Sequence, residues 1–153
     1  MAVGRRMEIG ALASVEDAAG EGDAAAELQR EALRHSYRAG DAASIAIGYH
    51  NLATYLPHRP TATLGLYLVS ALIFGLSGTG DDKDAVRQAA ADLSEYGAIP
   101  PSDIGDLCAV VGDIPGTDPA RLITRLAPRQ AAEQALRTLI SRIQEAAETE
   151  YAE

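Results

Sequence analysis

The chain has 153 residues, 47% of them hydrophobic, which is enough for one folded domain with a buried core. Its formal net charge of −9 disfavours binding to the phosphate backbone of a nucleic acid. A single cysteine excludes an internal disulfide framework and a structural zinc site built from several thiolates. Alanine is abundant and aromatic residues make up only 5%, which favours closely packed helices over sheet.

Glycine and proline divide the chain into segments of helical length. Apolar residues recur every three or four positions within each segment, and no stretch alternates with period two for long enough to predict a strand. A first pair of helices spans about 6–38, with a break at Gly20, and Gly40 ends it. The third helix, about 42–56, stops at Pro57, because a proline lacks the N–H that would continue it.

The rest of the chain contains five further predicted helices, at about 61–77, 82–96, 102–111, 119–127 and 129–150. Ser102 and Asp118 are the candidate N-caps of the two short ones, because their side-chain oxygens can accept hydrogen bonds from a first helical turn. The last helix carries its apolar residues on one stripe, from Ala132 to Ala147. The sequence therefore predicts an all-α fold with about eight helices.

The stretch from Leu64 to Leu76 is apolar almost throughout and carries no charge. It is shorter than the roughly 20 residues that a membrane-spanning helix needs. We interpret it as the central buried helix of the fold, with a membrane-associated helical protein as an alternative. No apolar stretch follows Arg5 and Arg6, so we expect no secretory signal and a cytoplasmic location.

A spaced pattern of bulky and small residues underlies the third and fourth helices. It reads Tyr49-x-x-Leu52-Ala-x-x-Leu56, then Gly65 and, four positions later, Val69. Small residues let paired helices approach closely, and large ones fill the groove of the facing helix. Related units begin upstream at Ile9 and downstream at Val86, which indicates a repeated helical pair.

This pattern resembles a divergent tetratricopeptide-repeat array, and the tail is similar to the ends of alanine- and arginine-rich bacterial repeat proteins. The resemblance implies one helical domain over 1–153, with repeats over 6–97 and a helical C-terminal cap over 98–153. It implies a right-handed array of antiparallel helix pairs that works as an interaction module or scaffold rather than as an enzyme. The implied partner is a protein or a peptide, and self-association stays open.

In such arrays the first helix of each pair lines a concave groove that holds the partner. Asn51 matches the asparagine that, in peptide-binding members, clasps the backbone or terminal carboxylate of the ligand. The lysines that complete that clamp are absent, since His50 and Thr54 stand in their places. The implied groove residues are Ile47, His50, Asn51, Thr54, His58, Arg87 and Gln88.

The alternative class is a small helical hydrolase centred on a cysteine or a histidine. Cys108 lies in an apolar run, where burial raises the thiol pKa and weakens its nucleophilicity, so we interpret it as a small buried core residue. His35, His50 and His58 lack the spacing of a metal site. We expect no catalytic residue, no metal and no cofactor.

Acidic residues concentrate between Asp81 and Asp118. We interpret this region as a solvated face on which several aspartates cap helices. A docking surface for a basic partner is the alternative.

Overall fold

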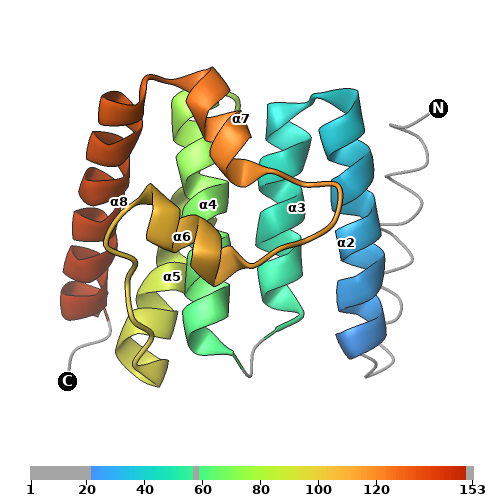
Figure 1. Ribbon diagram of the computed structural model, residues 1–153. Helices are drawn as coiled ribbons and strands as arrows, with labels where there is room; N and C mark the ends of the chain where they lie inside the picture. The colour runs from blue at the N-terminus through green and yellow to red at the C-terminus, as the bar shows by residue number, and fades with distance from the viewer. Residues whose placement is uncertain (1–21, 57–58, 151–153) are drawn as a thin grey trace.

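The computed structural model describes residues 22–56 and 59–150, and these ranges contain seven α-helices and no strand (Figure 1). The predicted all-α class is confirmed for this part of the chain. The helix expected before Gly20 and the turn at Pro57 lie outside the described residues. The helices are α2 (Gly22–Ala39), α3 (Ala42–Thr54), α4 (Pro60–Ser77), α5 (Lys83–Tyr96), α6 (Ile104–Val111), α7 (Pro119–Leu126) and α8 (Arg129–Glu150).

Most helix ends follow the glycines and aspartates of the sequence. Gly40 has a φ of +67°, a left-handed conformation that a glycine adopts without strain, and it separates α2 from α3. Asp41 then caps α3 by accepting a hydrogen bond from the Ser44 N–H at 3.3 Å. Asp118 caps α7 in the same way, at 3.0 Å from the Arg121 nitrogen, as the sequence predicts.

The cap predicted for α6 is wrong. Asp103 caps this helix, with its Oδ1 accepting from the Asp106 N–H at 2.7 Å. Ser102 instead donates from its backbone N–H to Asp106 Oδ2 at 2.9 Å. The aspartate directly precedes the helix, so its carboxylate reaches the free N–H groups of the first turn.

The helix α4 forms the centre of the arrangement. It packs against α3 and α5, while α2 lies beyond α3, and α8 packs against both α4 and α5. The two short helices α6 and α7 cross in front of α4, and the loop between them reaches over α3 toward α2 (Figure 1). This arrangement surrounds α4 on several sides, which is why every residue from Thr63 to Ile73 is buried.

Two contacts show how closely α4 is packed. A Cβ added at Gly65 would lie 2.8 Å from Val110 Cγ1 of α6, so a larger residue there would force α6 to shift. The Ser70 hydroxyl, also buried, donates to the Ala46 carbonyl of α3 at 2.6 Å. Small residues therefore bring two neighbouring helices close to α4.

By length and composition, α4 is the one helix among the described residues that could cross a membrane. It spans 18 residues, and 61% of it is buried inside the protein. The core helix of a soluble protein passes the same test, so this property is weak evidence for a membrane. The prediction that this segment is a central buried helix is confirmed by its burial.

The helix α8 buries one stripe only. Ala132, Leu136, Leu139, Ile143 and Ala147 are buried, as predicted from their spacing. The opposite stripe is exposed, and it includes Arg137, Arg142, Glu145 and Glu148. Arg142 also holds α8 to the start of α5, because its guanidinium donates to both carboxylate oxygens of Asp82 at 2.9 and 3.1 Å.

Candidate functional site

The two sides of α3 have different surroundings. Tyr49 is fully buried on one side, and its hydroxyl shares a 2.6 Å hydrogen bond with the Tyr37 hydroxyl of α2. Burial raises the pKa of Tyr49 to about 12, against hydrogen bonds from Tyr37 and Thr117 that lower it. Because Thr117 directly precedes the N-cap of α7, the segment that leads into α7 covers this side of α3.

The predicted groove residues of α3 lie on the other side. Positions 47, 50, 51 and 54 advance by three or four and therefore share a stripe that points away from Tyr49. Ile47 is 49% exposed and Thr54 is exposed, whereas His50 and Asn51 are partly buried. His58 lies outside the described residues.

The partly buried His50 packs against α4. Its ring lies edge-on to Tyr67, with 5.1 Å between the ring centroids, and its backbone carbonyl accepts a hydrogen bond from the Thr54 hydroxyl at 3.2 Å. Burial lowers the pKa of His50 below its usual 6.5, against an opposing effect of the Asp84 carboxylate of α5. The neutral imidazole is therefore favoured at neutral pH, which suits packing and hydrogen bonding more than charge pairing.

The predicted groove residues of α5, Arg87 and Gln88, are both exposed. Arg87 donates to Asp84 at 3.1 Å, an ion pair within the first two turns of the helix. Asp84 is thus the ion-pair partner of Arg87 and also the carboxylate whose charge acts on His50. We call the surface formed by Ile47, His50, Asn51, Thr54, Arg87 and Gln88 the α3–α5 face.

The cysteine prediction needs a correction. Cys108 is partly buried rather than fully buried, and it lines an open cleft of about 510 Å³ beside Asp118 and Pro119. Desolvation and the Asp118 charge both raise the pKa of its thiol. None of the residues that line this cleft is a histidine, so the thiol has no imidazole beside it of the kind that activates a catalytic cysteine.

The histidines do not form a metal centre in the part of the chain that the structure describes. His35 is buried in α2, with its Nδ1 3.5 Å from Arg38 Nη1, while His50 contacts Tyr67. No group of three or more histidine, cysteine, aspartate or glutamate side chains among the described residues could hold a metal ion.

The acidic region contains one exception to the predicted solvated face. Asp92 is only 9% exposed, and it accepts a hydrogen bond from the Thr63 hydroxyl of α4 at 2.9 Å. Desolvation raises the pKa of its carboxyl, although the Thr63 hydrogen bond opposes the shift. The other aspartates of this region are exposed or partly exposed, and Asp103 and Asp118 cap helices as expected.

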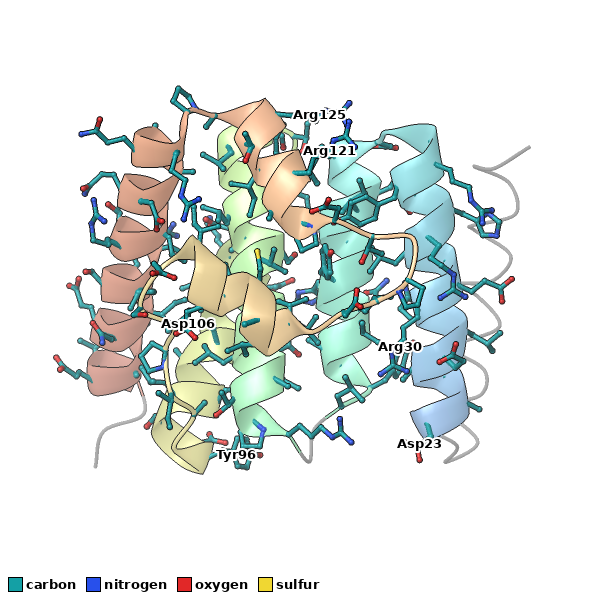
Figure 2. The ribbon with its side chains drawn as sticks, viewed as in Figure 1. Asp23, Arg30, Tyr96, Asp106, Arg121 and Arg125 are labelled. Carbon is teal, nitrogen blue, oxygen red and sulfur yellow. The ribbon has the colours of Figure 1, made fainter. Side chains whose placement is uncertain are left out.

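A cleft between α7 and the α2–α3 turn is a feature that the sequence analysis missed. Arg38, Arg121 and Arg125 line it, and its volume is about 590 Å³. Figure 2 shows Arg121 and Arg125 on the side of α7 that faces α3. Their spacing of four residues on a short helix was visible in the sequence, but the position of α7 over the start of α3 was not.

No family model, curated protein or solved structure matches this chain, so its own residues carry the functional argument.

Proposed function

We propose that the chain is a tetratricopeptide-like array of helix pairs that serves as a protein-interaction module, and that an extended peptide of a partner protein docks on the α3–α5 face. The observation that carries this proposal is the asymmetry of α3. The segment leading into α7 covers the Tyr49 side, while Ile47 on the opposite side is 49% exposed.

The packing of the first described helices supports a repeat array. Consecutive helices α2, α3, α4 and α5 each pack against the next one in the chain, as in arrays built from stacked helical units. Gly48 lets α2 and α3 approach, because a Cβ there would lie 2.8 Å from Leu33 Cδ1. The later helices α6, α7 and α8 instead return to α4, which agrees with a C-terminal cap.

The chemistry of the α3–α5 face suits an extended peptide. The Asn51 amide offers both a donor and an acceptor, which match the N–H and C=O groups of a peptide backbone. Ile47 offers an apolar contact, and Arg87 can pair with an acidic side chain by exchanging its exposed partner Asp84. The exchange costs little, because exposed ion pairs contribute only about 0–1 kcal/mol.

The test uses a photo-crosslinking amino acid at Ile47 in the native cell, with the same residue at Thr138 on the exposed side of α8 as the control. We expect a discrete crosslinked protein from position 47 only. A peptide of that protein should then bind the purified full chain, and Asn51→Ala with Arg87→Glu should weaken binding by roughly tenfold or more. Unchanged affinity in the double variant, at unchanged helicity, would contradict the proposal.

The hydrolase alternative receives less support from the structure. The raised pKa of Cys108 lowers its thiolate fraction, and its cleft holds no histidine. Slow reaction of the native thiol with a thiol reagent, compared with the unfolded chain, is the expected result. The membrane alternative is tested by extracting the protein from cells without detergent, where we expect the protein in the soluble fraction.

A further inference from the structure

The cleft between α7 and the α2–α3 turn concentrates positive charge on an acidic protein. Three arginines line it, one from the last turn of α2 and two from α7, against one lining carboxylate, that of Asp118. The Asp118 carboxylate is already engaged as the cap of α7. Arg38, Arg121 and Arg125 form no ion pair with any residue in 22–56 or 59–150.

The same cleft has an apolar lining. Ile45 contributes from α3, and Leu122 and Leu126 contribute from α7. Ile45 is buried at the base of the cleft, while Leu122 and Leu126 are partly exposed, so the cleft offers an apolar surface on α7 bordered by exposed guanidinium groups. A ligand that fits it carries negative charge and at least one large apolar group.

The wall of the cleft is held in place by close contacts. Gly116 has a φ of +83°, and a Cβ there would lie 3.0 Å from Arg34 Cδ, so the loop before α7 passes directly over α2. Beneath it the Tyr37 and Tyr49 hydroxyls are hydrogen-bonded, and burial raises the pKa of both. These contacts pre-organise the cleft and reduce the entropy that binding would lose.

We propose that this cleft binds an acidic peptide segment of a partner protein, with carboxylates paired to Arg38, Arg121 and Arg125 and one large apolar side chain against Leu122 and Leu126. Guanidinium groups bind carboxylates through two parallel hydrogen bonds, which gives direction as well as strength. Charge complementarity selects the occupant: the rest of this chain repels acidic segments, and the cleft attracts them.

This site is separate from the α3–α5 face. It lies on the Ile45 and Tyr49 side of α3, whereas Ile47 and Asn51 point the other way. The two proposals therefore fail independently. A variant of the α3–α5 face, Asn51→Ala with Arg87→Glu, leaves binding in the cleft unchanged.

The experiment selects short random peptides displayed on phage against the full chain and measures the affinity of the selected peptides by fluorescence anisotropy. The test variants are Arg121→Glu and Arg125→Glu, and the matched control is Arg137→Glu, which makes the same charge change on the exposed side of α8. Circular dichroism verifies that each variant keeps its helicity. Inorganic phosphate, titrated by calorimetry, distinguishes a simple anion site.

We expect selected peptides to carry net negative charge and at least one large apolar residue. Each cleft variant should weaken their binding by roughly tenfold or more, with stronger binding at low salt, while the control variant binds as the wild type does. Selection of neutral or basic peptides, selection of none, or equal loss in the control overturns the proposal. Phosphate binding that depends on Arg121 without any acidic peptide also overturns it.

Discussion

The helices α4 and α8 pack against each other, yet they are stabilised in different ways. All eleven residues from Thr63 to Ile73 of α4 are buried, so its apolar surface faces neighbours all round. The helix α8 buries every third or fourth residue and leaves the others partly buried or exposed. The burial of α4 therefore depends on several surrounding helices, whereas the burial of the apolar stripe of α8 needs only one neighbouring surface.

Removal of α8 tests this comparison most severely. A chain that ends after Pro128 uncovers the parts of α4 and α5 against which α8 packs. We expect aggregation or loss of cooperative unfolding, because a large apolar surface becomes exposed. Size-exclusion chromatography and a thermal melt by circular dichroism measure the effect. A truncated chain that stays monomeric with an unchanged Tm would show that α8 is peripheral.

Single substitutions sharpen the comparison at matched positions. Leu66 and Leu68 lie two residues apart on α4, on nearly opposite sides, and both are fully buried. Leu66→Ala and Leu68→Ala should each lower the free energy of unfolding by about 2–5 kcal/mol. On α8 the same spacing joins buried Leu136 to exposed Thr138.

We expect Leu136→Ala to cost about 2–5 kcal/mol as well, and Thr138→Ala about 0.5 kcal/mol or less. Chemical denaturation measures all four variants. If Leu66→Ala and Leu68→Ala differ as widely as the α8 pair, then α4 is not covered all round, and the comparison fails.

A smaller effect than that of the core leucines is expected at the buried hydroxyl of α4. Thr63→Val removes the donor to Asp92 and should cost about 1–3 kcal/mol near neutral pH, because a buried carboxylate loses a partner. Burial raises the pKa of Asp92 above 3.8, so the folded state binds this proton more readily than the unfolded state. The contribution of this group to stability therefore rises as the pH falls through the pKa of the folded state.

The variant should raise the pKa of Asp92 further, since the Thr63 hydroxyl is what lowers it. The loss of unfolding free energy in Thr63→Val relative to wild type should then become smaller at acidic pH. Urea denaturation at several pH values measures this trend, and Asp92→Asn serves as the control in which the trend is absent. If the loss of unfolding free energy does not change with pH, it comes from packing alone.

The sequence predicted the described helices closely, because strong local signals mark their ends. Gly40, Asp41 and Asp118 act through contacts within a few residues, and such contacts are visible in the sequence alone. The cap of α6 was misassigned to Ser102 because two adjacent residues, Ser102 and Asp103, can both serve as N-caps. The local signal was present there but ambiguous.

Features that join distant segments escaped the sequence analysis. The burial of Asp92 depends on Thr63, twenty-nine positions earlier, and the arginine cleft joins Arg38 to Arg121 and Arg125. The periodicity of a single helix does not predict a contact between segments that lie far apart in the sequence. The resemblance to tetratricopeptide repeats implied the residues of the α3–α5 face, and helical spacing places its α3 residues on one stripe, but neither gives the identity of a ligand.

The full cover of α4 has a consequence for the order of events during synthesis. Once α4 has been synthesised, only α2 and α3 of the described helices precede it, and its neighbours α5, α6, α7 and α8 have yet to be made. Residues 78–150 then take about 4–15 s to translate, at roughly 5–20 residues per second. During that time a charge-free helix of 18 residues is a target for chaperones and for the insertion machinery of membranes. Correct folding thus depends on how long α4 remains without the C-terminal half of the chain.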